Sequence, residues 1–177
     1  INCENMSKIG DNVIPMQIDV SSQKAVDEIF EKAEAELGKI DIFYANAGYP
    51  YYELMDYTDW DRTARMFETN VYSPIYSYQK YVKHLDGRQG QFAITVSAIG
   101  KMAMPGFTVY SASKFAMEGF QQGIRLEIPK NVTLTCLYPI ATDTNFFKAA
   151  NEVEFERPFP VQSPAVVARK MVAGLEK

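Results

Sequence analysis

The chain has 177 residues, of which 47% are hydrophobic, and it carries a formal net charge of −4. This length is typical of a single domain with a sizeable core, so we expect one domain over residues 1–177. The lack of a basic run argues against a nucleic-acid partner, and no apolar stretch approaches the ~20 residues that span a membrane.

Hydrophobic patterns predict the elements of the first half of the chain. Residues 13–19 are apolar and partly β-branched, which predicts a strand. Apolar residues recur at helical spacing over 26–37, and Gly38 is a plausible stop for that helix. Residues 41–46 predict a short strand, and the tyrosine-rich stretch 50–58 predicts a loop because its aromatic residues follow no regular spacing.

The same alternation of strands and helices continues in the second half. A long helix is expected over about 58–84, interrupted near Pro74, and it is followed by a strand over 91–97. A second long helix is expected over about 107–128, and a further strand over 131–138.

Two shorter elements complete the expected order. A short helix is predicted over 142–150, and a last amphipathic helix is predicted from Pro164. Strands that alternate with helices of this length indicate a parallel sheet with helices on both faces. Ligands of such sheets bind beyond the carboxyl ends of the strands. The polar residues expected at those ends are Asp19, Asn46, Ser97 and the segment from Pro139 onward.

Cysteine and histidine usage limits the chemistry. The two cysteines, Cys3 and Cys136, form no disulfide framework, and no signal peptide is recognisable, so a reducing cytoplasm is the expected location. The single histidine, His84, is interpreted as a solvated residue at the end of a helix. Because the chain offers one histidine and no paired cysteines, no metal site is expected.

Tyr110 and Lys114 are the strongest candidates for catalysis. Residues at i and i+4 share one face of a helix, so the lysine ammonium can stand beside the phenol and lower its pKa. Lowering the pKa of a phenol from about 10 to about 7 requires roughly 4 kcal/mol of differential stabilisation. The tyrosine would then exchange protons near neutral pH, and the hydroxyl of Ser97 could bind the same substrate oxygen. Taken alone, the pair is also consistent with a solvated helix face.

Asn70 and Pro74 form a second informative pair. Proline has no N–H, so Pro74 cannot donate to the carbonyl of Asn70 four residues earlier, and its ring pushes that carbonyl outward. The freed carbonyl could hold a water molecule. The alternative is a kink that only fits the helix around the core.

Together these residues make the chain resemble the short-chain dehydrogenase/reductase family over nearly all of its length. Asn46-Ala47-Gly48 looks like the family's Asn-Ala-Gly, and Pro139 through Thr144 is similar to its Pro-Gly-x-x-x-Thr segment. The resemblance implies a Rossmann-like, doubly wound parallel α/β sheet. It also implies an NAD(P)-dependent oxidoreductase that acts on a ketone or secondary alcohol, with NAD or NADP as cofactor.

The same resemblance implies roles for individual residues. Ser97 would orient the substrate carbonyl, Tyr110 would donate the proton, and Lys114 would lower the tyrosine pKa and bind the nicotinamide ribose. The backbone carbonyl of Asn70 would hold a water that joins a proton relay. The implied catalytic residues are Asn70, Ser97, Tyr110 and Lys114. The implied cofactor contacts are Asp19, Val20, Asn46, Ala47, Gly48, Tyr110, Lys114, Pro139, Ile140, Thr142 and Thr144.

The chain departs from the family pattern in two places. Ile140 stands where the family usually has glycine, which adds bulk beside the nicotinamide. The glycine-rich phosphate loop is absent before Val13, so the sheet is expected to lack its first two strands and its last one, and we expect the protein to be longer. Were the chain complete, the alternative is a non-catalytic scaffold or interaction protein of the same lineage. Asp19, implied to contact the adenine ring, could instead cap the helix that starts near Ser22.

Substrate and partners are only loosely indicated. No nucleic-acid or membrane partner is expected. Aromatic and methionine residues near the candidate site predict an apolar pocket for a small-molecule substrate. These residues are Tyr51, Tyr52, Met102, Met104, Phe107 and Phe147. The resemblance implies a homodimer or homotetramer, and small residues on the Tyr110 helix would permit close packing, either between subunits or within the chain. These are Ser111, Ala112, Ala116, Gly119 and Gly123.

Overall fold

The computed structural model describes residues 3–56, 59–146 and 160–176. Its α-helices are α1 (Cys3–Ser7), α2 (Gln23–Leu37), α3 (Trp60–Phe67), α4 (Ser73–Leu85), α5 (Thr108–Glu127) and α6 (Pro164–Leu175). A π-helical segment, η1 (Glu68–Tyr72), joins α3 to α4, and a 3-10 turn, η2 (Ala98–Gly100), precedes α5. The strands are β1 (Ile42–Ala45), β2 (Gly90–Thr95) and β3 (Val132–Leu137).

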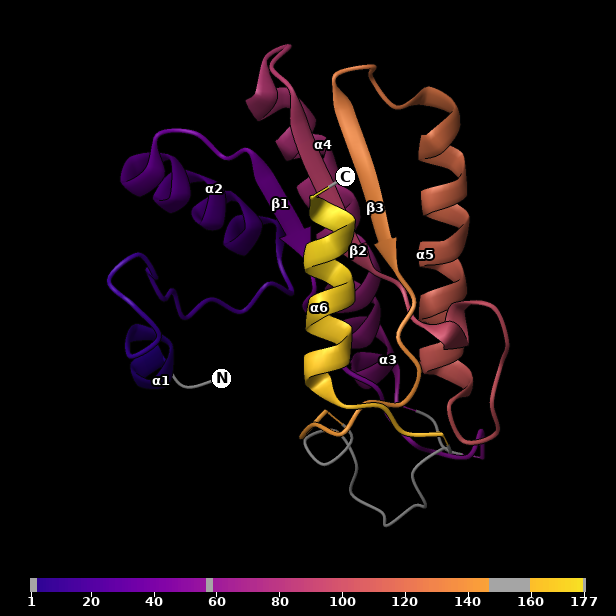
Figure 1. Ribbon diagram of the computed structural model, residues 1–177. Helices are drawn as coiled ribbons and strands as arrows, with labels where there is room; N and C mark the ends of the chain where they lie inside the picture. Colours follow the sequence, from indigo (N-terminus) through magenta and orange to yellow (C-terminus); the bar gives the residue numbers. More distant parts are fainter. Residues whose placement is uncertain (1–2, 57–58, 147–159, 177) are drawn as a thin grey trace.

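The three strands form one parallel sheet with the order β1-β2-β3 (Figure 1). Phe43 pairs with Phe92 between β1 and β2, and Ala93 pairs with Thr135 between β2 and β3. The central strand β2 is buried through Phe92, Ala93 and Ile94, as expected of a parallel strand covered on both faces. The predicted parallel α/β architecture is therefore confirmed for these three strands.

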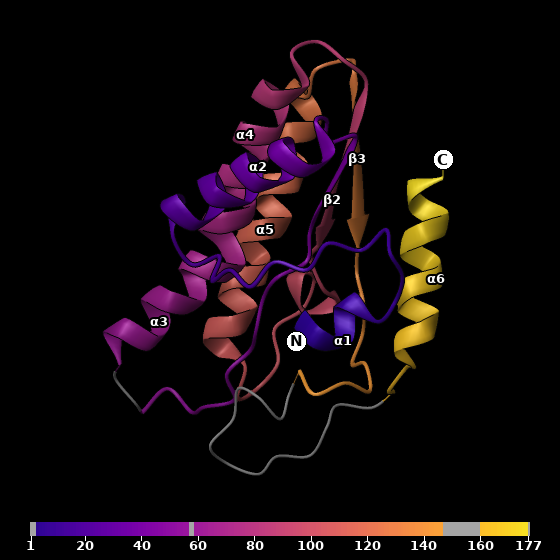
Figure 2. The same cartoon turned by 90° about the vertical axis from the view of Figure 1, so that its left-hand side faces the viewer.

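Helices cover both faces of the sheet. Figure 2 shows α2, α4 and α5 on one face and α6 on the other, where it packs against β3. The main core lies under the first group of helices and includes a stack of three aromatic rings, Phe30, Phe43 and Phe92. Their centroids are 5.1 Å and 5.6 Å apart and their planes are nearly parallel. This stacking fixes α2 against the sheet through aromatic contacts that exceed simple area burial.

Local sequence accounts for the ends of α2. Ser22 is its N-cap, with the hydroxyl accepting the Ala25 N–H at 3.2 Å. Gly38 ends the helix at φ 71°, a conformation that only glycine adopts easily, and its N–H donates to Glu34. Asp19 does not cap this helix, because its carboxylate accepts the N–H of Ser21 in the preceding turn. The capping interpretation of Asp19 is therefore wrong.

Residues 13–19 do not form the predicted strand. The segment is outside the sheet, and Ile14 and Met16 are 48% and 38% exposed. Within the described residues β1 pairs only with β2, so this apolar segment has no ladder to join. A β-rich composition becomes a strand only where a neighbouring strand satisfies its backbone groups.

The long helix expected over about 58–84 is present but changes its pitch before Pro74. Over η1 the hydrogen bonds span five residues, as between the Ser73 N–H and the Glu68 carbonyl. Pro74 lies in the first turn of α4, where its missing N–H is tolerated. The wider π turn therefore lies where the proline interrupts regular bonding, and it contains Asn70.

His84 is a structural residue and not the solvated one that its position suggested. Its ring is 9% exposed, and its Nε2 accepts the N–H of Ile40 at 3.0 Å. The ring proton must then lie on Nδ1, which donates to the carboxylate of Glu34 at 2.7 Å. His84 thus joins the end of α4 to α2 and to the residues that lead into β1.

Candidate active site

The structure brings together the four residues predicted to handle protons. Ser97 follows β2, Asn70 lies in η1, and Tyr110 and Lys114 stand one turn apart on α5. All four are buried, with exposed fractions between 1% and 9%. The hydroxyl of Ser97 lies close enough to the phenol of Tyr110 to lower its pKa, and the Lys114 Nζ lies 5.8 Å from the centre of the Tyr110 ring. The four side chains meet at the carboxyl end of the sheet.

Lys114 reaches the end of β2. Its Nζ donates to the carbonyl of Thr95 at 3.1 Å. Gly48 lies against it: a Cβ placed there would be 3.7 Å from this Nζ and 3.0 Å from the Asn70 Oδ1. The glycine of the Asn-Ala-Gly turn is therefore needed for a close approach of the backbone to two of the four residues.

The Asn70 side chain is held by hydrogen bonds that the sequence did not reveal. Its Oδ1 accepts the Tyr49 N–H, and its Nδ2 donates to the Tyr49 carbonyl, both at 3.0 Å. The same Nδ2 donates to the hydroxyl of Ser113 at 3.1 Å, and that hydroxyl donates to the carbonyl of Tyr110 at 2.7 Å. Ser113 is therefore a missed residue, and its i+3 spacing from Tyr110 was the available signal.

Burial dominates the ionisation of the tyrosine and the lysine. It raises the pKa of Tyr110 to about 12, and the hydrogen bond from Ser97 offsets only part of this effect. It also lowers the pKa of Lys114 to about 8. The expected lowering of the tyrosine pKa by Lys114 is therefore wrong for this chain. The physical reason is that the ammonium is directed at the carbonyl of Thr95, while loss of solvent disfavours the phenolate.

Ser97 holds an unusual backbone conformation. Its φ of 130° is one of two positive values among non-glycine residues in the described part of the chain. The flanking groups are fixed to β3: the Val96 N–H donates to Leu137 at 2.8 Å and the Ala98 N–H to Pro139 at 3.0 Å. Strained backbone of this kind is typical of functional sites, where the surrounding structure imposes it.

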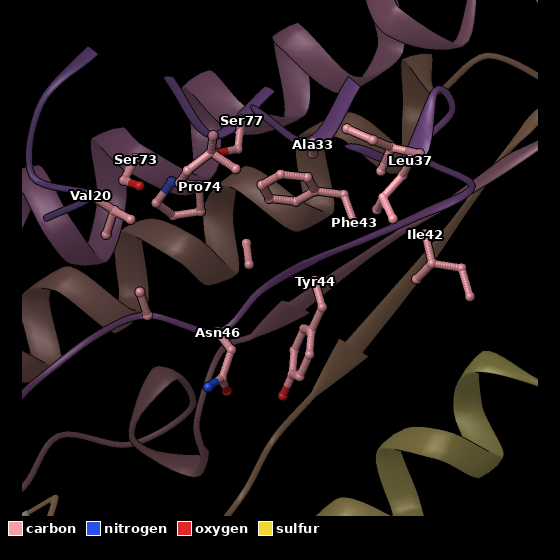
Figure 3. A pocket seen from close by; sticks show the side chains of 14 residues that line it. Val20, Ala33, Leu37, Ile42, Phe43, Tyr44, Asn46, Ser73, Pro74 and Ser77 are labelled. Atoms are coloured by element: carbon pink, nitrogen blue, oxygen red, sulfur yellow. The ribbon is translucent and has the colours of Figure 1, made fainter. Parts of the chain in front are cut away.

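Three residues predicted to contact the cofactor line one cavity. Val20, Asn46 and Ala47 border a space of about 330 Å³ between α2, β1 and α4 (Figure 3). Figure 3 shows Phe43 and Pro74 on one side of β1 and Asn46 on the other. The Asn46 Oδ1 accepts the hydroxyl of Thr95 at 2.8 Å, which fixes this side chain at the carboxyl end of the sheet.

The remaining predicted cofactor contacts lie on two other segments. Asp19 is exposed in the turn before α2. Ile140 is 40% exposed beyond β3, and its carbonyl accepts the Thr142 hydroxyl at 2.9 Å. The Thr144 hydroxyl accepts the N–H of Phe146. Thr142 forms an isolated parallel bridge with Gln162, so the helix expected over 142–150 is absent over its described part, 142–146.

Aromatic side chains enclose Tyr110. Phe107 and Phe146 stand edge-on to its ring at centroid distances of 6.3 Å and 6.1 Å. Tyr51, Tyr52 and Met104 of the predicted pocket belong to the same cluster. Met102 is 62% exposed and is not part of it, and Phe147 lies outside the described residues. Phe146 was missed because nothing in its local pattern distinguishes it from its neighbour.

The described residues offer neither a candidate metal site nor a helix that could cross a membrane. Over residues 3–56, 59–146 and 160–176, no three histidine, cysteine or acidic side chains gather into a candidate metal site. Among the helices in those ranges, none combines the length and the apolar character needed to cross a bilayer.

Comparison with known proteins points to one family. A family model for short chain dehydrogenases matches residues 2–154. A glycine betaine reductase of Emericella nidulans is 30% identical over 166 residues, covering 93% of this chain and 13% of the relative. An uncharacterized oxidoreductase of Bacillus subtilis is 28% identical over 183 residues, covering 98% of this chain and 51% of the relative. The chain thus spans about half or less of the length of these curated relatives.

A solved structure shares the fold. The alcohol dehydrogenase from the archaeon Thermococcus sibiricus, complexed with 5-hydroxy-NADP, superimposes with a TM-score of 0.83 at 23% identity. The match covers 98% of this chain and 73% of that one. Since the same α/β arrangement is found there, the three-stranded sheet described above is part of a Rossmann-like fold.

Proposed function

The chain belongs to the short-chain dehydrogenase family, and we propose that it carries the catalytic site of an NAD(P)-dependent oxidoreductase. The observation that carries this proposal is that the buried hydroxyls of Ser97 and Tyr110 lie together, with Lys114 one helical turn away. A hydroxyl pair of this kind can bind a carbonyl oxygen and supply it with a proton. The substrate class we propose is a ketone or the corresponding secondary alcohol.

Ser97 and Tyr110 have different roles at the substrate oxygen. Ser97 donates a hydrogen bond that polarises the carbonyl, and Tyr110 transfers its proton to the oxygen as the adjacent carbon is reduced. Burial raises the pKa of Tyr110 to about 12, so the phenol holds its proton at neutral pH and can donate it to a substrate oxygen. The aromatic cluster around Tyr110 supports an apolar substrate.

The residues at the carboxyl end of the sheet fit a nicotinamide cofactor. Lys114 offers a buried amine beside Tyr110, and Gly48 keeps the neighbouring backbone close, so ribose hydroxyls could be bound there. Asn46 and Ala47 would hold the cofactor from β1, and Thr142 and Thr144 from the segment after β3. The cofactor supplies the hydride, and these side chains orient it.

A titration with NADH and NADPH tests cofactor binding. Nicotinamide fluorescence is the suitable probe, because Trp60 is 85% exposed on α3 and makes a poor reporter of this site. We expect saturable enhancement with at least one of the two cofactors in the whole protein, and the preferred one identifies the cofactor. Enhancement should be weaker in Lys114→Met and unchanged in Lys130→Met, a matched change at an exposed lysine. Failure of both cofactors to bind would favour the non-catalytic scaffold.

We also propose that the protein forms a homodimer or homotetramer through α5. Gly119 and Gly123 face open space, since a Cβ on either would meet no described atom within 4 Å. Phe115 and Leu126 on the same helix are 46% and 91% exposed. These two glycines therefore do not pack within the described part of the chain, whereas Ser111 is buried and Ala116 packs against the main core. A cytoplasmic location remains part of the proposal and is consistent with the free thiol of Cys136.

Light scattering tests the oligomer. We expect a mass of two or four subunits for the unmodified protein and a monomer for Phe115→Lys, because a buried ammonium would oppose association. Thr133→Lys, at an exposed position on β3, is the matched control and should leave the mass unchanged. A monomeric unmodified protein would refute the interface.

A further inference from the structure

A buried carboxylate with no assigned role lies one turn beyond Lys114 on α5. Glu118 is 6% exposed, and both of its oxygens are paired. Tyr138 donates its hydroxyl to Oε2 at 2.6 Å, Gln121 donates to Oε1 at 3.0 Å, and the Lys101 ammonium forms an ion pair with Oε1. These contacts join three segments of the chain at one charged group.

The charge on Glu118 is firmly held. Burial alone would raise its pKa, but the hydrogen bonds from Lys101, Tyr138 and the neighbouring glutamines outweigh that effect and lower the pKa to about 2. The Lys101 Nζ also lies 5.2 Å from the centre of the Tyr138 ring, so the two partners contact each other as well as the carboxylate. Glu118 is therefore negatively charged at neutral pH and accepts contacts from both Lys101 and Tyr138.

The two partners of Glu118 flank Ser97. Lys101 directly follows the η2 turn that begins after Ser97, and Tyr138 directly follows β3. The backbone carbonyls on both sides of Tyr138 accept the N–H groups on both sides of Ser97, at 2.8 Å and 3.0 Å. Glu118 thus binds the segment after Ser97 with one oxygen and the strand that holds Ser97 with the other.

Close packing of η2 against α5 links the position of Ser97 to that of Tyr110. A Cβ on Gly100 would lie 3.0 Å from the Lys114 carbonyl and 2.9 Å from the Val96 Cγ1, so η2 rests directly on the backbone of α5. A shift of η2 would therefore move Ser97 relative to Tyr110. A residue in a strained conformation keeps it only where its surroundings leave no relaxed alternative.

We propose that Glu118 is a positioning residue that holds Ser97 in its strained backbone conformation by fixing Lys101 and Tyr138 to α5. The catalytic consequence rests on the proposed function, because Ser97 must meet the same substrate oxygen as Tyr110. The effect of Glu118 on the backbone of Ser97 follows from the contacts alone, so it can be tested without an assay of turnover.

Unfolding measurements isolate the strain. Ser97→Ala and Ser97→Gly both lose the hydroxyl, but only glycine adopts φ 130° without a steric cost. The difference in the free energy of unfolding between the two variants therefore reports the backbone strain. We expect glycine to be favoured over alanine in the wild-type background and this preference to shrink in Glu118→Gln. Equal preferences in the two backgrounds, a result typical of independent sites, would overturn the proposal. Lys101→Met provides a second background should Glu118→Gln fail to fold.

Steady-state kinetics tests the catalytic consequence. In the whole protein Glu118→Gln should lower kcat by about tenfold to a hundredfold, the loss typical of a small misplacement of a catalytic group, and leave the KM for the cofactor nearly unchanged. Glu127→Gln, at an exposed position on the same helix, is the matched control and should retain full activity. A Glu118→Gln variant as active as this control would overturn the positioning role. Were the wild-type protein itself inactive, the proposed function would fail, and the unfolding comparison would still decide the strain.

Discussion

Replacing Tyr110 with phenylalanine is expected to lower kcat by about 10²–10⁴, the usual contribution of a general acid. The change removes one hydroxyl and leaves the ring, so the packing of Phe107 and Phe146 around it is preserved. Ser97 keeps its hydrogen bond from the N–H of Ile99 at 3.3 Å and should remain in place. The loss should therefore lie in turnover and not in folding.

Three measurements on the whole protein separate these effects for Tyr110→Phe. Steady-state kinetics gives the loss in kcat, fluorescence titration with NADH or NADPH should give nearly unchanged binding, and thermal unfolding should show a similar Tm. Tyr72→Phe is the matched control, because Tyr72 is 61% exposed and its hydroxyl lies outside the site. A Tyr110→Phe variant that kept most of its turnover would exclude Tyr110 as the proton donor.

Sequence patterns predicted the parts of the fold that depend on local signals. The end of α2 at Gly38, the strands β1 to β3 and the start of α6 at Pro164 were predicted from spacing and turn residues. The strand expected over 13–19 did not form, since a strand depends on a neighbour and not only on its own composition. His84 shows the same limit: its partners Ile40 and Glu34 lie far away in the sequence.

The four residues proposed for the candidate site could be selected from the sequence, but the electrostatics of the site could not. Spacing and resemblance selected Asn70, Ser97, Tyr110 and Lys114, which the fold brings together. The ionisation of Tyr110 depends on how completely the site excludes solvent and on where the Lys114 ammonium points. The spacing of residues in the sequence predicts neither. The contacts of Glu118 were hidden for a related reason, because Lys101 and Tyr138 meet it only through the tertiary fold.

Lys114→Met is expected to abolish turnover while raising stability at neutral pH. Burial lowers the pKa of Lys114 from 10.5 to about 8, so keeping it protonated in the folded chain at pH 7 costs roughly 3 kcal/mol. Methionine fills a similar volume without this cost. Loss of the hydrogen bond to the Thr95 carbonyl offsets about 1 kcal/mol of the gain. A gain in stability with a loss of activity is the expected pattern for a charge buried for function.

The dependence on pH makes the Lys114→Met prediction specific. Between the folded pKa of about 8 and the ordinary value of 10.5, the unfolded wild-type chain binds one more proton than the folded chain, so wild-type stability rises with pH. The variant lacks this group, and its advantage should therefore shrink as pH rises from 7 to 10, while titration of Tyr110 affects both proteins alike. Denaturant unfolding at several pH values measures the difference, with Lys130→Met as the exposed control. An advantage that stayed constant over this range would mean that Lys114 is not buried as a charged group, which would contradict the prediction.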